Sequence, residues 1–84
     1  MPEEEVGVVT HWFGHLNVAG IKVTKGSIKV GDTLHYKGHT TDFTEKVASI
    51  QDEHKGIAEA KKGADIGIKV TQKARDHDKV FRVT

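Results

Sequence analysis

The chain contains no cysteine and only one proline among its 84 residues. Without cysteine it forms no disulfide and offers no thiolate ligand to a metal ion. Aromatic residues are few, with one Trp, one Tyr and three Phe, so we expect neither a large apolar pocket nor a cofactor. No apolar run reaches membrane-spanning length, and the acidic N-terminal stretch is the reverse of a signal peptide's charged region. We therefore expect a cytoplasmic protein.

Charge of either sign is also not in large excess, because 13 Lys and Arg stand against 12 Asp and Glu, a formal net charge of +1. This balance argues against a strongly basic nucleic-acid binder. The distribution is nevertheless uneven. Beyond Val70 the chain carries Lys73, Arg75, Lys79 and Arg82 against Asp76 and Asp78, with Lys69 just before them. This predicts either a modest positive face or an ordinary solvated surface.

Sequence motifs typical of covalent or nucleotide chemistry are missing too. The only serines are Ser27 and Ser49, and neither lies in a Gly-x-Ser-x-Gly elbow. No Gly-x-x-x-x-Gly-Lys-Ser/Thr phosphate loop is present, which excludes GTP hydrolysis by this sequence alone. We expect no catalytic residues and no enzymatic activity.

Alternation of apolar and polar residues predicts β-strands along the whole chain. The expected strands cover residues 6–13, 18–25, 33–37, a long fourth segment containing 43–50, then 65–71 and 80–83. Turns are expected at 14–17 and 38–40, and a tight corner at Gly31-Asp32, where glycine accepts a positive φ and the carboxylate accepts backbone hydrogen bonds. Residues 57–62 are too closely bracketed by Gly56 and Gly63 for a stable helix.

These strands favour a closed barrel. A chain this small buries only about 60% of its unfolded surface, and closure removes exposed strand edges. In the fourth strand the apolar face switches between Val47 and Ala48, which predicts a β-bulge or a barrel corner. The expected fold is therefore all-β, a six-stranded closed barrel over residues 6–84, preceded by an acidic tail over residues 1–5.

Six histidines include two His-aromatic-x-Gly-His motifs, at residues 11–15 and 35–39. On a strand, four residues separate side chains by roughly 13 Å, whereas zinc requires three or four convergent ligands. We therefore interpret these histidines as polar residues at strand ends and expect no metal site, unless the glycine turns fold back and a carboxylate joins.

Trp12 and Phe13 are adjacent on one expected strand and must point to opposite faces. One ring is then buried, and the other is at least partly exposed. An exposed ring beside His11 and His15 either stacks on a base, anchors a protein partner, or only covers the mouth of the barrel.

Residues 19–32, with the sequence AGIKVTKGSIKVGD, resemble a turn-and-strand signature of the β-barrel domain of translation elongation factors. The likeness extends over VGVVTHWFGHLNVAGIKV, SIKVGDTLHYKGHTTDFTEKVASIQDEH and IAEAKKGADIGIKV, in the order that the family uses. The chain thus resembles a free-standing relative of the second domain of elongation factor Tu. The C-terminal barrel of some collagenase-like peptidases looks similar.

The resemblance implies a translation-factor-type barrel that acts as a binding module and contacts tRNA or ribosomal RNA. The alternative is a protein-interaction module that docks onto a separately encoded GTPase or peptidase-like enzyme. The candidate residues for binding RNA or a partner are Trp12, Phe13, Lys37, Lys69, Lys73, Arg75 and Arg82. Salt dependence distinguishes the two hypotheses, because only phosphate contacts release many counterions.

Overall fold

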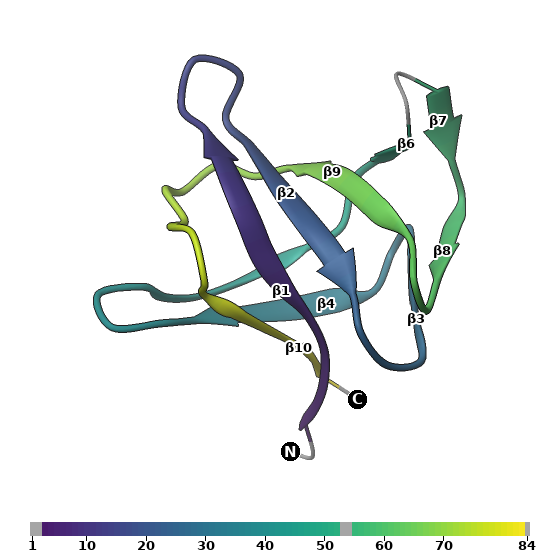
Figure 1. Ribbon diagram of the computed structural model, residues 1–84, viewed down its shortest axis with the longest axis horizontal. Helices are drawn as coiled ribbons and strands as arrows, with labels where there is room; N and C mark the ends of the chain where they lie inside the picture. The colour runs from purple at the N-terminus through teal and green to yellow at the C-terminus, as the bar shows by residue number, and fades with distance from the viewer. Residues whose placement is uncertain (1–2, 53–54, 84) are drawn as a thin grey trace.

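The computed structural model describes residues 3–52 and 55–83, which form ten strands and contain no helix (Figure 1). The strands are β1 (Glu3–Phe13), β2 (Val18–Val23), β3 (Ser27–Lys29), β4 (Thr33–Lys37), β5 (Asp42–Lys46), β6 (Ile50–Asp52), β7 (Lys55–Ile57), β8 (Glu59–Lys61), β9 (Asp65–Lys69) and β10 (Lys79–Val83). Over these residues, no helix has the length and hydropathy needed to cross a membrane. The predicted all-β class is confirmed.

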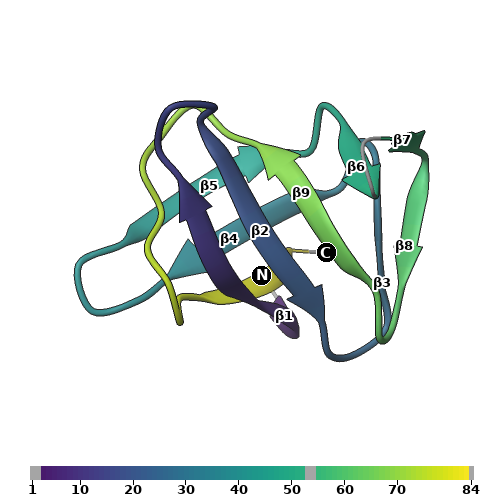
Figure 2. The ribbon, with the colours of Figure 1, turned by 45° about the horizontal axis from the view of Figure 1, so that its top comes forward.

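Eight strands form one antiparallel sheet in the order β5-β4-β10-β1-β2-β9-β6-β7, and β3 pairs only with β8. Figure 2 shows how the larger sheet curls round on itself. Its two end strands, β5 and β7, are not paired with each other, so the ladder stays open. The predicted six-stranded closed barrel is therefore wrong in its strand number and in its closure.

The sheet does not close, because the segments around residues 30–32, 47 and 58 are joined by isolated hydrogen bonds and form no continuous strand pair between β5 and β7. Val30 N–H donates to the carbonyl of Ala58 at 3.0 Å, and Gly31 N–H donates to that of Val47 at 2.9 Å. Val47 N–H in turn donates to the carbonyl of Asp32 at 2.8 Å. Isolated bonds of this kind satisfy the buried backbone without forming a continuous strand pair.

The tight corner at Gly31-Asp32 forms as predicted. Gly31 has a φ of 97°, which suits glycine, and the Asp32 carboxylate accepts a hydrogen bond of 2.9 Å from Lys29 N–H. The predicted switch after Val47 is also present, since residues 47–49 are not in a strand and separate β5 from β6. Consequently β5 pairs with β4, whereas β6 pairs with β9.

Residues 1–5 were expected to form an acidic tail. Residues 1 and 2 lie outside the described residues, and the three acidic residues lie in the sheet instead. Glu3, Glu4 and Glu5 open β1 and pair with β10, with Glu4 opposite Arg82 in the register. Glu4 contacts the Arg82 guanidinium at 3.6 Å, and Glu5 contacts Lys79 at 3.6 Å. Opposite charges across neighbouring strands stabilise the pairing by about 0.2–1 kcal/mol each, which offsets the low strand propensity of glutamate.

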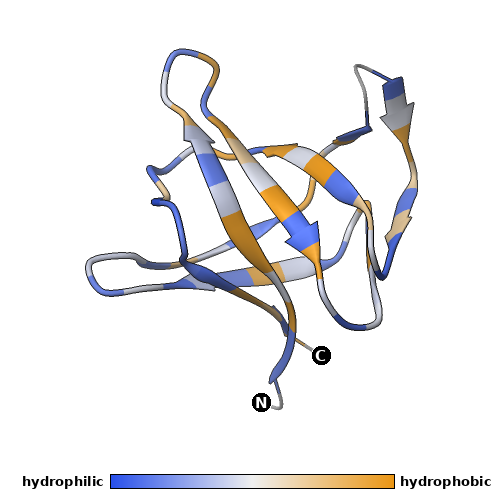
Figure 3. Cartoon of the chain, viewed as in Figure 1, coloured by the Kyte–Doolittle hydropathy of each residue, from blue (hydrophilic) through white to orange (hydrophobic). Residues whose placement is uncertain are grey.

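A single apolar core lies inside the curl. Figure 3 shows hydrophobic residues alternating with more polar ones along β9, as one-sided burial requires. Leu34, Ile66 and Val70 are buried in this core. Tyr36 and Phe43 stack across β4 and β5, with ring centroids 4.7 Å apart. The curl thus leaves its outer face, its hairpin ends and the 70–78 loop available for binding.

Candidate functional site

The turn between β1 and β2 holds two large apolar side chains in solvent. Phe13 is 43% exposed and Leu16 is 62% exposed. Leu16 N–H donates to the carbonyl of Phe13 at 3.1 Å, and Asn17 adopts a φ of 54°, a conformation that asparagine tolerates. The turn is therefore a defined structure that fixes both side chains. Of the adjacent aromatic pair, Phe13 is the more exposed ring and Trp12 packs partly against the core, as alternation predicts.

Two glycines face each other on the neighbouring strands. Gly20 on β2 is the register partner of Gly67 on β9, so this part of the sheet carries no side chain. A Cβ at Gly20 would lie 3.3 Å from the Phe13 ring, and one at Gly67 would lie 3.1 Å from Cγ1 of Val18. The Phe13 and Val18 side chains thus lie beside the backbone of Gly20 and Gly67. The sheet surface has a hollow there, because the two glycines have no side chains to fill it.

The hollow is a cavity of about 380 Å³, lined by residues that include Phe13, Leu16, Val18, Gly20 and Gly67. A second cavity of about 220 Å³ shares Leu16, Val18, Gln51 and Gly67 with it and extends to Ser49 and Lys69. We call the two together the apolar groove. The His11 ring packs edge-on against Phe13, with centroids 4.4 Å apart, and supports one wall. Such a groove suits apolar side chains from another molecule.

A separate cavity of about 430 Å³ is lined by His11, Trp12, Lys73, Ala74, Arg75 and Asp76. We call it the basic cavity. Lys73 and Arg75 are exposed, whereas Ala74 between them is buried in the core and holds this part of the loop down. The basic cavity therefore combines the Trp12 ring with two cations. This combination suits a ligand that has an aromatic ring and a negative charge, such as a base with its phosphate.

Three contacts fix the 70–78 loop to β1. The backbone N–H of Trp12 donates to the Asp76 carboxylate at 2.9 Å. The backbone N–H of Val9 donates to the carbonyl of Asp78 at 2.7 Å, and the backbone N–H of His77 donates to the carbonyl of Val9 at 2.7 Å. Asp78 is only 4% exposed, and its carboxylate accepts a bond of 2.8 Å from Arg75 N–H. Asp76 and Asp78 thus hold the loop in place through hydrogen bonds, although their charges reduce the net positive charge of the loop.

The seven predicted binding residues lie in four places. Trp12, Lys73 and Arg75 line the basic cavity. Phe13 and Lys69 lie on the apolar groove. Lys37 is exposed at the end of β4, next to Gly38, where an added Cβ would meet the Asp78 carboxylate. The cations from Lys69 to Arg82 are therefore dispersed, and they do not form one positive face.

Arg82 lies apart from the other cations. Its guanidinium contacts the Glu4 carboxylate and donates to the carbonyl of Ser27 at 3.3 Å. Its side chain is 27% exposed and its Nε is buried without a hydrogen-bond partner. These contacts link β10 with β1 and with the start of β3, so Arg82 contributes to the structure of the sheet.

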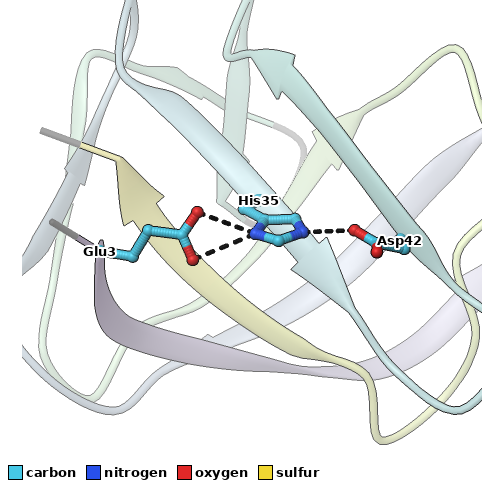
Figure 4. A network of polar contacts seen from close by, with 3 residues as sticks. All are labelled: Glu3, His35 and Asp42. Atoms are coloured by element: carbon cyan, nitrogen blue, oxygen red, sulfur yellow. Dashed lines mark hydrogen bonds and ion pairs between the residues drawn. The ribbon is translucent and has the colours of Figure 1, made fainter. Parts of the chain in front are cut away.

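The histidine motifs separate in the structure. His11 packs on Phe13, whereas His35 lies between the carboxylates of Glu3 and Asp42 (Figure 4). The hydrogen bond to Asp42 raises the pKa of His35, with partial burial opposing and Glu3 reinforcing this effect. The same bond lowers the pKa of the Asp42 carboxyl. Within residues 3–52 and 55–83, no group of three or more His, Asp or Glu side chains is arranged to hold a metal ion.

Sequence analysis missed Leu16, Gly20 and Gly67 as parts of a surface. An apolar residue inside a polar turn, as in Gly-His-Leu-Asn, is one signal for Leu16. Isolated glycines inside expected strands are a signal for close approach of another group to the backbone. That the two glycines lie side by side follows only from the β2–β9 register.

Residues 7–79 match the family model described as elongation factor Tu domain 4. The chain belongs to this family. The predicted likeness to elongation factor Tu is thereby confirmed at the level of the family. Initiation factor aIF5B from Aeropyrum pernix has a similar fold, with a TM-score of 0.65 and 17% identity over 95% of this chain and 14% of that one.

Peptidases form a second group of relatives, as the resemblance to collagenase-like barrels predicts. An uncharacterized protease from Methanocaldococcus jannaschii is 36% identical over 78 residues, which are 92% of this chain and 19% of that protein. A collagenase from Porphyromonas gingivalis is 35% identical over 92% of this chain and 22% of its own length. The chain thus spans about a fifth of the curated relatives it matches.

The C-terminal domain of a putative U32 peptidase from Geobacillus thermoleovorans has the same fold. Its TM-score is 0.88 at 18% identity, covering 96% of this chain and 93% of that domain. Its selenomethionine variant gives a TM-score of 0.85 at 19% identity, covering 92% and 96%.

Proposed function

We propose that this chain is a non-catalytic protein-binding module that docks onto the catalytic unit of a peptidase-like enzyme. The relatives support this choice, because the matched region is about a fifth of two proteins named as a protease and a collagenase. A domain of this fold also accompanies a putative U32 peptidase.

The observation that carries the proposal is the pair of exposed side chains over the apolar groove. Phe13 and Leu16 are held out by a defined turn, and the bare backbone at Gly20 and Gly67 leaves room beside them. Burying one such side chain contributes about 1.5–3 kcal/mol, and interfaces commonly depend on a few anchors of this kind. The groove also has polar lining residues, which are Thr10, His11, Ser49, Gln51, Asp65 and Lys69.

The test uses P. gingivalis collagenase from which the matched 78 residues have been removed. Titration of this protein with the chain by calorimetry is expected to show saturable binding with a Kd in the micromolar range or tighter. Leu16→Ser should weaken binding at least about tenfold, since loss of one buried anchor of about 1.5 kcal/mol corresponds to that factor.

Val30→Ser is the matched control for Leu16→Ser. Val30 is also a large apolar residue, 45% exposed, but it lies in the corner after β3 and outside the groove. This variant should bind like the parent chain. Equal weakening by the two substitutions, or no saturable binding by the parent, would contradict the proposed docking surface.

RNA binding is a second candidate function, favoured by the basic cavity. Trp12, Lys73 and Arg75 were predicted from sequence as candidates for binding RNA or a partner, and all three line this cavity, with Lys37 exposed near the same loop. A base stacked on an aromatic ring, with cations at its phosphates, is a common arrangement in single-strand recognition. A cytoplasmic location stays a prediction that accompanies this hypothesis.

If the basic cavity binds tRNA, two or three phosphate contacts give a plot of log affinity against log salt with a slope of about −2 to −3. Arg75→Ala should make that slope shallower by about one unit, as measured by fluorescence anisotropy. Lys69→Ala removes the same charge beside the apolar groove and should leave the slope unchanged. An equal effect of both substitutions would indicate non-specific attraction and would remove this candidate.

A further inference from the structure

The His35 imidazole on β4 is held between two carboxylates that come from different strands. Its Nδ1 lies 2.9 Å from Oε2 of Glu3 on β1, and its Nε2 lies 2.5 Å from Oδ1 of Asp42 on β5. Figure 4 shows the ring between the two acids, with one nitrogen directed at each. The His35 side chain is only 16% exposed. This arrangement joins three strands through one titratable ring.

Only a protonated ring satisfies both contacts. The imidazolium donates from both nitrogens, whereas neutral imidazole donates from one and presents a lone pair at the other. At a pH where both acids are ionised, loss of the proton therefore leaves one carboxylate facing a lone pair. That contact then becomes repulsive, and the link to either Glu3 or Asp42 is lost.

The surrounding charges do not replace this link. On β1, Glu5 follows Glu3 on the same face and is already paired with Lys79 of β10 at 3.6 Å. From β10 the ring of Phe81 approaches His35, with centroids 6.2 Å apart, and it carries no charge. On β4, Lys37 acts on Asp42 and helps to keep that carboxyl ionised. The two acids thus have His35 as their shared hydrogen-bonding partner in this cluster.

We propose that Glu3, His35 and Asp42 form a proton-dependent latch that fastens the N-terminal end of β1 to the β4–β5 hairpin. Protonation closes the latch, and deprotonation breaks its contact with Glu3 or with Asp42. The latch lies at the opposite end of β1 from Phe13, so it regulates the sheet and not the contacts of the apolar groove. Its test is therefore independent of the proposed docking function.

The direction of the pH dependence follows from the two altered groups. The pKa of His35 is raised above the ordinary 6.5, so its stabilisation is complete below pH 6.5 and is lost as the pH rises through the folded value. The pKa of Asp42 is lowered below the ordinary 3.8, so its stabilisation is complete above pH 3.8 and is lost as the pH falls through the folded value. The latch is strongest between these two limits.

The test is an NMR titration of the whole chain between pH 5 and pH 9, following the His35 ring nitrogens and the backbone amides of Glu4, Glu5 and Arg82. We expect a ring midpoint above 6.5, with both nitrogens protonated at the acid end. The β1 and β10 amides should shift with that same midpoint. A ring midpoint at or below 6.5, or amides that do not follow it, would overturn the latch.

Two variants identify the source of the amide shifts. His35→Gln should abolish the pH-dependent shift of Glu4 and Glu5, because glutamine does not titrate. His39→Gln is the matched control, since His39 is an exposed histidine of the same hairpin, and it should leave the shift in place. If His35→Gln fails to fold, Glu3→Gln serves instead, and it should lower the ring midpoint. A midpoint unchanged by Glu3→Gln would also overturn the proposal.

Discussion

Substitution of Gly7 by alanine is expected to destabilise the fold by about 3 kcal/mol. Gly7 is buried in β1, where its Cα partners are Val23 of β2 and Val80 of β10. A Cβ there would lie 2.6 Å from the backbone carbonyl oxygen of Lys22. A backbone atom in a central strand pair cannot move away without separating the strands. Overpacking costs about 1–3 kcal/mol, and each lost hydrogen bond adds about 1 kcal/mol.

Urea unfolding of Gly7→Ala measures this loss against a glycine of the opposite kind. Gly56 is exposed, and a Cβ there would meet nothing within 4 Å. Gly56→Ala should therefore change the free energy of unfolding by less than about 0.5 kcal/mol, as an ordinary surface substitution does. A Gly7→Ala protein within about 1 kcal/mol of the parent would show that β1 and β2 are less closely packed than the structure indicates.

Gly38→Ala is expected to cost about 2 kcal/mol and to loosen the loop that carries Lys73 and Arg75. A Cβ at Gly38 would overlap Oδ1 of the Asp78 carboxylate. The Asp78 side chain would have to move and would lose its bond to Arg75 N–H. Leaving a buried carboxylate and a backbone donor poorly satisfied costs about 1–3 kcal/mol.

A double-mutant cycle tests whether Asp78 is the cause. In an Asp78→Ala background the overlapping oxygens are absent, so Gly38→Ala should cost clearly less than it does in the parent. Gly14→Ala is a control in another turn, where the nearest atom to a new Cβ is 3.5 Å away, in ordinary contact. Equal costs of Gly38→Ala in the two backgrounds would assign the strain to the backbone of the β4–β5 turn.

The parts of the fold that could be predicted from sequence are those set by neighbours in the chain. The Gly31-Asp32 corner depends on a glycine φ and on a carboxylate three residues from its donor, Lys29. The strand over 33–37 has its predicted limits, and the break after Val47 follows from a change in the apolar pattern. Local chemistry suffices for each of these features.

Two kinds of feature were not predicted: strands too short to be recognised, and contacts between residues far apart in the sequence. Strands β3, β7 and β8 have three residues each, too few for an alternating pattern to be recognised. Glu3 to Glu5 read as a solvated tail because their partners on β10 are more than 70 residues away. The same reason hid the position of Arg82, whose charge suggested phosphate but whose guanidinium contacts Glu4 and the Ser27 carbonyl.

Several residues of the candidate site were predicted from the sequence, but how they are grouped on the surface was not. Opposite faces for Trp12 and Phe13 follow from strand geometry alone, and the structure agrees. The separation of Lys73 and Arg75 from Lys69 follows from the path of the 70–78 loop, whose Asp76 and Asp78 accept hydrogen bonds from β1. A net charge computed along the sequence carries no information on that path.

The most direct test of the docking proposal is to map its contact surface by NMR. The chain, labelled with ¹⁵N, would be titrated with P. gingivalis collagenase lacking the 78 matched residues. The account predicts that amide signals of Phe13, Leu16, Gly20 and Gly67 change first and most, while those of Lys73 and Arg75 change little. Changes centred on Lys73 and Arg75, or no saturable change at all, would contradict docking through the apolar groove.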